Sequence, residues 1–266
     1  MENAEKRTSP IGIIDSGVGG LTVAGRLTCD LPHEDVIYVG DSKNCPYGNK
    51  SADEIFSLSL KMLEFLQKQG VKCVAVACNT ISALADYLQR RINYPIISIV
   101  DCAAEGVARK NPEAVGFIAT EFTVKSGVYE RLISARLPEC RVVSAASEKL
   151  AALIDGGSVG GSEVEAEIKK CVGGILEKEH IKSLILGCTH YPIVAESFKK
   201  CFPDIELIDP AVYQCEKIEK FLAENGLLND SGRNFTLYTT GNTAAYSAVL
   251  RHLGAKAPEK AVHTSL

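Results

Sequence analysis

The sequence predicts an α/β protein of two similar domains with mostly parallel sheets, related by a pseudo-two-fold axis and with a functional site at their interface. Short apolar runs of strand length alternate with longer stretches of helical periodicity, which is the pattern of strand, helix, strand units. In addition, a pair of polar motifs recurs in the two halves of the chain. These two observations determine the fold class.

Nine mostly apolar runs have the length expected of strands in a parallel sheet covered by helices on both faces. They are residues 11–14, 36–39, 73–77, 96–100, 115–118, 142–143, 183–186, 206–208 and 235–239. Clear helical periodicity marks residues 55–69 and 164–179. Their expected inward faces are Ile55, Leu58, Met62, Phe65 and Leu66 in the first stretch, and Ile168, Val172, Ile175 and Leu176 in the second.

The internal repeat centres on two cysteines. Cys78-Asn79-Thr80 follows one apolar run, and Cys188-Thr189-His190 follows a similar run 110 residues later. Weaker echoes relate residues 11–16 to 115–120 and residues 99–101 to 207–209. Because ligands of open α/β sheets bind beyond the carboxyl ends of the strands, both sets of polar residues are expected to meet around one pocket.

The repeat also predicts the domain organisation. We expect residues 1–108 to form a first α/β domain that carries Asp15 and Cys78, and residues 109–210 to form a second that carries Cys188 and His190. Residues 211–266 should add a helix, a strand and a helix that pack back on both domains, with residues 254–266 as a loose tail.

Charge and composition exclude several classes of protein. A formal net charge of -4 offers no broad positive field to a phosphate backbone, so nucleic acid is not expected as a partner. Residues 1–10 lack the apolar core of a secretory signal, and the apolar runs are far shorter than the roughly 18 residues that span a bilayer. We therefore expect a cytoplasmic protein without membrane contact.

Ten cysteines in such a chain indicate reduced thiols rather than a disulfide framework. No Cys-x-x-Cys occurs and the five histidines are not spaced as zinc ligands, so no metal site is expected. A cysteine inside a strand, such as Cys73, is usually a small buried hydrophobe. Cys78 and Cys188 differ because they recur at one structural place and are each followed by hydrogen-bonding side chains.

Two cysteines on opposite sides of a cleft suit the inversion of a stereocentre by two-base proton transfer. Groups that reach one carbon from opposite faces each lie roughly 3 to 3.5 Å from it, which leaves the sulfurs around 7 Å apart and unable to form a disulfide. A reference pKa near 8.5 allows one cysteine to be thiolate while its partner is thiol.

Each thiol also has a candidate assistant. His190 lies two residues beyond Cys188, and Asp15, at the end of the first expected strand, could serve Cys78. The simpler alternatives are a loop histidine that bonds the backbone and an aspartate that caps the following helix. Both alternatives stay open.

The segment Asp15-Ser16-Gly17-Val18-Gly19-Gly20 follows a strand and precedes a helical run. It is a poor dinucleotide fingerprint, since Thr22 stands where the third glycine is required. We interpret it as a tight turn whose free backbone N–H groups, with Ser16, receive an anion such as a carboxylate.

Four segments resemble the signature segments of glutamate racemases in the aspartate/glutamate racemase family. They are residues 13–23, residues 38–41 with 46–48, residues 77–80 and residues 187–192. The resemblance runs from about Gly12 to Gly254, and the cysteines alone are shared with aspartate and hydantoin racemases. It implies interconversion of L- and D-glutamate without a cofactor, a supply of D-glutamate for peptidoglycan, and a homodimer.

The resemblance also implies roles for individual residues. Cys78 would deprotonate D-glutamate and Cys188 would deprotonate L-glutamate, with Asp15 and His190 assisting. The residues that would hold the substrate's ammonium and two carboxylates are Ser16, Tyr47, Gly48, Asn79, Thr80, Thr120, Thr123 and Thr189, and Asp41 matches a further acidic position near the site. This chain departs from the family where a glutamate usually follows a proline and precedes a glycine. Asp155 stands there without the proline and is expected to substitute with a shorter reach.

Three rival interpretations remain. A racemase for aspartate would use similar donors in a pocket of different length, although the Tyr47-Gly48 match favours glutamate. A thiol hydrolase with one nucleophilic cysteine and His190 as base leaves the duplicated Cys78 unexplained. The third rival is a non-catalytic small-anion binding protein of two α/β lobes.

Overall fold

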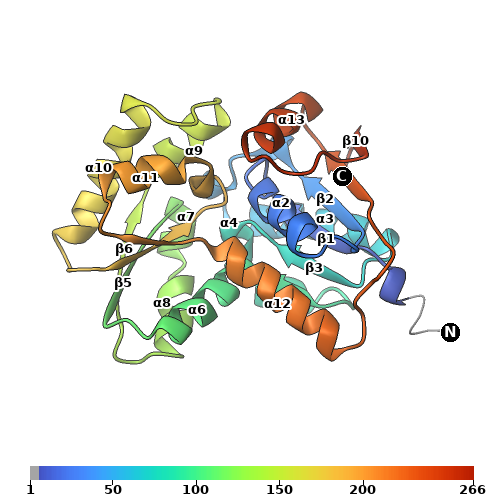
Figure 1. Ribbon diagram of the computed structural model, residues 1–266, viewed down its shortest axis with the longest axis horizontal. Coiled ribbons are helices and arrows are strands. Elements are labelled where there is room, and N and C mark those ends of the chain that lie inside the picture. The colour runs from blue at the N-terminus through green and yellow to red at the C-terminus, as the bar shows by residue number, and fades with distance from the viewer. Residues whose placement is uncertain (1–5) are drawn as a thin grey trace.

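The computed structural model describes residues 6–266 and shows two lobes, each a parallel β-sheet flanked by helices (Figure 1). The first lobe, blue to cyan in Figure 1, also contains the red C-terminal segment. The second lobe is green to yellow and orange. The predicted α/β class with two parallel sheets is confirmed. The expectation that residues 1–10 form no secretory signal rests partly on residues 1–5, which lie outside the described residues.

All neighbouring strands in both sheets are parallel. The first sheet has the order β10-β9-β2-β1-β3-β4 and the second has the order β6-β5-β7-β8. The strands of the first sheet are β1 (Ile11–Asp15), β2 (Val36–Gly40), β3 (Cys73–Val76), β4 (Ile96–Ser98), β9 (Phe235–Thr239) and β10 (Lys260–His263). Those of the second are β5 (Ala114–Ala119), β6 (Arg141–Ala146), β7 (Ser183–Gly187) and β8 (Glu206–Ile208).

The two lobes share one topology. The order β2-β1-β3-β4 in the first sheet is repeated as β6-β5-β7-β8 in the second. The repeat in the sequence therefore corresponds to equivalent strands, and β3 and β7 occupy the same place in their sheets. Consequently, the residues that follow β3 and β7 lie at corresponding carboxyl ends, where parallel sheets bind ligands.

Helices cover the faces of both sheets. The first lobe contains α2 (Leu21–Asp30), α3 (Ala52–Lys68), α4 (Asn79–Ser82) and α5 (Ala85–Gln89), with the short turns η1 (Ser42–Asn44) and η2 (Tyr47–Asn49). The second contains α7 (Glu121–Lys125), α8 (Val128–Ser134), α9 (Glu148–Asp155), α10 (Ser162–Leu176), η3 (Tyr191–Val194) and α11 (Ala195–Cys201). The helices predicted over residues 55–69 and 164–179 correspond to α3 and α10. Helix α3 starts earlier than predicted because Ser51 and Glu54 form a reciprocal capping box.

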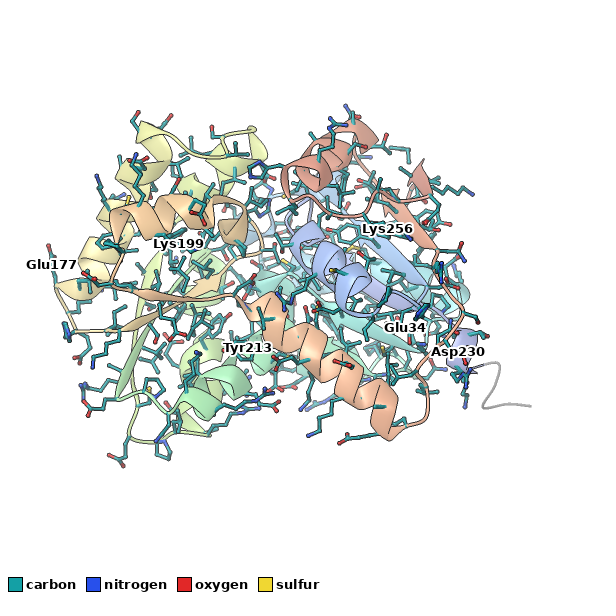
Figure 2. The ribbon with its side chains drawn as sticks, viewed as in Figure 1. Glu34, Glu177, Lys199, Tyr213, Asp230 and Lys256 are labelled. Atoms are coloured by element: carbon teal, nitrogen blue, oxygen red, sulfur yellow. The ribbon has the colours of Figure 1, made fainter. Side chains whose placement is uncertain are left out.

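Two helices connect the lobes. Helix α6 (Ile99–Lys110) carries the chain from the first sheet to the second, and α12 (Pro210–Glu224) carries it back along the lower edge of the view in Figure 1. The two pack against each other. The guanidinium of Arg109 on α6 lies over the ring of Tyr213, which is labelled on α12 in Figure 2, and donates to Glu216 at 2.7 Å. These contacts hold α6 and α12 together.

Two details of the sequence-based prediction are wrong. Residues 99–100, expected to end a strand, begin α6, because the Ser98 hydroxyl accepts from the backbone N–H of Asp101 and caps the helix. The expected loose tail contains β10, which pairs with β9. Residues 211–266 thus comprise α12, β9, α13 (Thr243–His252) and β10, and both strands extend the first sheet. Within residues 6–266, no helix has the length and apolar character needed to cross a bilayer.

Candidate active site

Cys188 directly follows β7, and Cys78 lies two residues beyond the end of β3. The two cysteines therefore lie at equivalent ends of the two sheets. Both are buried, with only 4% and 7% of their surface exposed. Burial, and then the charge of Asp15, raise the pKa of Cys78 to about 12, and the nearby Cys188 adds to this rise. The structure therefore brings the two predicted thiols within electrostatic reach of each other.

The hydroxyl of Ser16 and the backbone N–H of Ile81 are polar partners of Cys78. The Ser16 Oγ lies 3.6 Å from the Cys78 sulfur. Asp15 acts on Cys78 through its charge, whereas its Oδ1 accepts the N–H of Gly17 at 2.9 Å and its carboxylate also accepts that of Gly20. The expectation that the glycine turn keeps its N–H groups free for an anion is thus wrong for these two groups, because Asp15 itself occupies them.

Asp15 lies in an environment unusual for a carboxylate. It is fully buried, and this burial raises its pKa to about 6 against the opposing effects of His190, the turn N–H groups and Thr189. A carboxyl group with such a pKa retains a proton under mildly acidic conditions. Perturbed carboxyl groups of this kind concentrate at functional sites.

Cys188 has a histidine and a carboxylate as its neighbours. Its sulfur lies 3.5 Å from Nδ1 of His190, whose Nε2 lies 2.7 Å from Oδ1 of Asp155. Burial alone would lower the pKa of His190, but the bonds to Asp155 and Cys188 outweigh it and raise this pKa well above its ordinary value. The imidazolium form of His190 therefore stands beside the Cys188 sulfur.

Asp155 keeps its negative charge in this arrangement. Burial would raise its pKa, yet the bonds to His190 lower it below the ordinary value of an aspartate. The short aspartate side chain thus reaches the histidine directly.

The two lobes meet closely between the thiols. Oγ1 of Thr189 in the second lobe donates to Oδ2 of Asp15 in the first at 3.1 Å. At Gly19 an added Cβ would stand 2.4 Å from Thr189 Oγ1 and 2.7 Å from Nδ1 of His190. Only glycine allows the turn of one lobe to approach the second lobe's motif at this distance.

Three threonine hydroxyls form a cluster across the lobes. Oγ1 of Thr80 lies 3.0 Å from that of Thr120 and 3.5 Å from that of Thr123, and the latter two are 2.9 Å apart. Thr120 also caps α7 by accepting the N–H of Thr123. The structure thus gathers these three predicted binding residues in one place.

Asn79 beside this cluster has an unused donor. Its Oδ1 accepts the hydroxyl of Tyr129 at 2.7 Å, while its Nδ2 is buried and has no hydrogen-bond partner among residues 6–266. Because a buried amide N–H without a partner costs on the order of 1 to 3 kcal/mol, it is available to an oxygen of a bound molecule.

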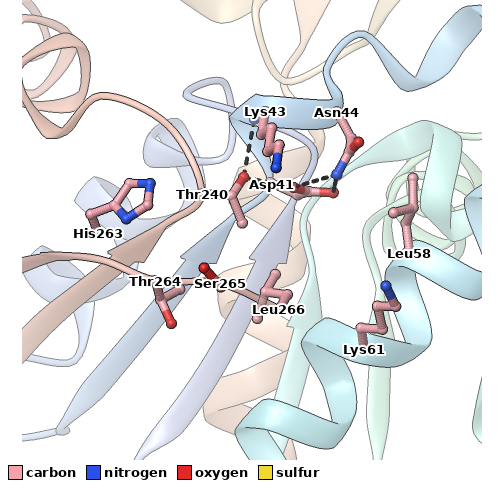
Figure 3. A pocket seen from close by; sticks show the side chains of 10 residues that line it. All are labelled: Asp41, Lys43, Asn44, Leu58, Lys61, Thr240, His263, Thr264, Ser265 and Leu266. Carbon is pink, nitrogen blue, oxygen red and sulfur yellow. Dashed lines mark hydrogen bonds between the residues drawn. The ribbon is translucent and has the colours of Figure 1, made fainter.

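Asp41 holds the buried Tyr47. The Tyr47 hydroxyl donates to Oδ2 of Asp41 at 2.7 Å, and Thr240 donates to Oδ1 at 2.6 Å. Figure 3 shows Asp41 beside Asn44 and Thr240 at the edge of a cavity of about 310 Å³. Asp41 therefore orients Tyr47 from outside the thiol pair.

Gly48 lies at a second opening. A cavity of about 590 Å³ is lined by residues 48–51 of the first lobe and by Glu121, Phe122, Lys125 and Ser126 of the second. It lies next to the threonine cluster, since a Cβ at Gly48 would be 3.0 Å from Thr120. This cavity marks where the seam between the lobes opens to the surface.

Sequence reasoning missed Cys45. Its sulfur donates to Oδ2 of Asp155 at 3.7 Å, and the Ser16 hydroxyl also hydrogen-bonds to it. The available signal was its place directly before Pro46-Tyr47-Gly48, a segment already singled out.

In residues 6–266 no group of three or more His, Cys, Asp or Glu side chains is arranged to hold a metal ion.

The fold and the site together define a two-lobed α/β enzyme with a duplicated thiol motif. A sequence profile of the Asp/Glu/Hydantoin racemase family matches residues 24–218. The chain belongs to this family.

Similar proteins extend the likeness over almost the whole chain. The glutamate racemase of Carboxydothermus hydrogenoformans is 39% identical over 257 residues, which cover 94% of this chain and 92% of that protein. The structure of the glutamate racemase of Francisella tularensis in complex with D-glutamate matches with a TM-score of 0.90 and 35% identity, over 97% of this chain and 98% of the other. A glutamate racemase isoform of Bacillus anthracis matches with a TM-score of 0.91 and 32% identity, over 98% of both chains.

Proposed function

We propose that the protein is a glutamate racemase that interconverts L- and D-glutamate without a cofactor, by two-base proton transfer in which one of Cys78 and Cys188 removes the α-proton and the other returns a proton to the opposite face. The observation that carries this proposal is the pair of buried thiols at equivalent strand ends, each with its own polar partner. Relatives named glutamate racemase that match nearly the whole chain support the choice of substrate.

In the proposed mechanism the α-carbon of glutamate lies between the two sulfurs. One thiolate removes the α-proton, and the opposite thiol donates a proton to the other face. Cys188 with its imidazolium partner would deprotonate L-glutamate, and Cys78 would deprotonate D-glutamate. The substrate's ammonium would favour the thiolate of Cys78, whose pKa is otherwise raised by burial and by Asp15.

Polar groups around the thiols would hold the substrate. The free amide of Asn79 and the hydroxyls of Thr80, Thr120 and Thr123 offer donors to carboxylate oxygens. The remaining proposed binding residues are Ser16, Tyr47, Gly48 and Thr189. We assign Asp15, His190 and Asp155 to proton handling and Asp41 to the orientation of Tyr47.

The biological setting follows from the activity. D-glutamate is a component of peptidoglycan, so we propose that the protein supplies it in the cytoplasm. We further propose that it acts as a homodimer and that residues 1–108 and 109–210 are the two domains that close on the substrate. Sedimentation of the purified protein would test the dimer.

The central test follows the α-proton. The purified protein is incubated with each glutamate enantiomer in heavy water without added cofactor or metal, and optical rotation and α-proton exchange are recorded. We expect rotation to decay to zero from either side while deuterium enters the α-position. A hydrolase or a binding protein would leave both signals flat, and faster turnover of aspartate in the same assay would identify an aspartate racemase.

The roles of the thiols are tested by Cys78→Ala and Cys188→Ala. Each should slow racemisation by about 10³-fold or more in both directions, because inversion needs an acid and a base. Cys73→Ala is the matched control, since Cys73 is equally buried but lies inside β3. Unimpaired turnover by either site variant would exclude the two-base assignment.

A further inference from the structure

The carboxylate that supports His190 is held from the opposite lobe. Asp155 is the last residue of α9, so it stands at the negative end of a helix dipole, where a carboxylate is disfavoured. The loop that follows contains Gly157 and Gly161 with positive φ, 92° and 99°, and its backbone N–H groups cap the helix by donating to the carbonyls of Leu153 and Ile154. These bonds satisfy backbone carbonyls and not the Asp155 carboxylate. Asp155 therefore depends on donors outside its own helix.

Those donors come from both lobes. Oδ1 of Asp155 bonds Nε2 of His190 at 2.7 Å, and Oδ2 accepts the thiol of Cys45 at 3.7 Å. Cys45 lies in the first lobe, between η1 and η2. The side chain of Asp155 is one-third exposed, so the thiol shields one of its oxygens from water.

Cys45 is suited to be a permanent donor. Burial, followed by the charges of Asp155, Asp15 and Cys78, raises its pKa well above that of an ordinary thiol, so the sulfur keeps its proton. A hydrogen bond from Ser16 to the same sulfur lowers this pKa, but by less than burial and the three charges raise it. A protonated thiol beside a carboxylate has one favourable role, which is to donate.

These contacts form a continuous chain between the two predicted catalytic thiols. It runs from Cys78 through Ser16 and Cys45 to Asp155, and from there through His190 to Cys188. Cys45 is the point at which this chain crosses from one lobe to the other.

Building on the proposed racemase activity, we propose that Cys45 is a positioning residue that fixes Asp155 beneath His190 when the lobes are together and so couples the His190–Cys188 pair to lobe closure. The side-chain partners of Cys45 are Asp155 and Ser16, so we assign it no proton transfer of its own. It acts through Asp155, whose charge keeps His190 in the imidazolium form beside Cys188.

The test compares pH profiles of kcat/KM for the wild-type protein, Cys45→Ala and Cys45→Ser. Without the thiol donor, Asp155 is no longer held at 2.7 Å from Nε2 of His190. We expect this loss of position to outweigh the gain in basicity of the carboxylate, so the alkaline limb should move to lower pH. At about pH 8.5 the value for Cys45→Ala should fall about five-fold, which corresponds to the loss of one ordinary hydrogen bond. The fall should be smaller at about pH 6.5. Cys45→Ser retains a donor and should restore most of the alkaline limb.

A double-mutant cycle separates positioning from packing. If Cys45 acts through Asp155, Cys45→Ala should have no further effect on the pH profile in an Asp155→Asn background. Cys201→Ala is the matched control, because Cys201 is also half-buried and bonded but lies in α11. Superimposed profiles for Cys45→Ala and the wild type, or equal losses in both backgrounds, would overturn the inference. Wild-type racemisation measured in the same assay tests the proposed racemase activity itself. Failure of that proposal is therefore distinguishable from failure of the proposed role of Cys45.

Discussion

The surroundings of Cys78 and of Cys188, here called the two half-sites, occupy equivalent places in the two sheets but differ in chemistry. Cys78 and Cys188 follow equivalent strands, yet Cys78 neighbours a hydroxyl and the charge of Asp15, whereas Cys188 neighbours an imidazole backed by Asp155. The first environment retains a proton on sulfur, and the second places an imidazolium beside the sulfur. The equivalent strands thus set the positions of the two thiols, and the different neighbours set different charges around them.

This asymmetry has a limited kinetic consequence. Because L- and D-glutamate have equal free energies in water, the equilibrium constant is one, and kcat/KM must be the same in both directions. A difference between the half-sites can appear only in kcat and KM separately. If the free protein holds its proton on Cys78, it is ready to accept L-glutamate.

The largest expected change comes from filling the seam between the half-sites. Gly19→Ala would place a methyl group 2.4 Å from Thr189 Oγ1 and 2.7 Å from Nδ1 of His190, so these two side chains, or the lobe that carries them, must move. Since a displacement of about 1 Å costs on the order of 10²-fold in rate, we expect kcat/KM to fall by about this factor in steady-state assays.

Gly173→Ala provides the control for this change. Gly173 lies in α10, and an added Cβ there would meet no atom within 4 Å. This variant should keep full activity and gain about 0.5 to 1 kcal/mol in the free energy of unfolding. Full activity of Gly19→Ala would contradict the close approach of the two motifs.

The second prediction concerns the buried carboxyl of the Cys78 half-site. The pKa of Asp15 rises from 3.8 to about 6 in the folded protein, so between these values the folded state binds more protons than the unfolded state. Stability is therefore lost as pH rises through this window, by at most about 3 kcal/mol. Asp15→Asn removes this cost and should unfold at higher urea concentration than the wild type at about pH 7, but not at about pH 4.

The control for Asp15→Asn is the same change at Asp204, an exposed residue. Its effect on the free energy of unfolding should stay within about 0.5 kcal/mol at both pH values. A stability difference for Asp15→Asn that does not depend on pH would disprove the assignment. Lower activity with higher stability is the expected combination at a functional position.

Much of the fold, and the equivalence of the two thiol positions, could be predicted from the sequence. The nine predicted strands are all present, and the repeat correctly indicated equivalent positions for the two thiols. The contact between Cys188 and His190 was also predictable, because the two lie two residues apart in one motif. Local patterns of this kind need no knowledge of how the lobes meet. The functional roles of these residues stay predictions.

What the sequence did not reveal depends on tertiary contacts. The bond between Cys45 and Asp155 joins residues 110 positions apart, and no local pattern links them. Strand β10 was missed because its four residues are mostly exposed and include Lys260 and His263, so they lack an apolar run. Whether the N–H groups of the glycine turn were free depended on the direction of the Asp15 side chain, which a motif does not specify.

The last prediction removes the feature that distinguishes the Cys188 half-site. Asp155→Asn takes away the negative charge that raises the pKa of His190, so this pKa falls and the imidazolium is lost at lower pH. At about pH 8.5 we expect kcat/KM to fall about ten-fold, equally for L- and D-glutamate, with a smaller loss at about pH 6.5. Initial rates with each enantiomer across this pH range provide the measurement. A loss of the same size at every pH would mean that Asp155 only shapes the site, and the chemical difference between the half-sites would then rest on His190 alone.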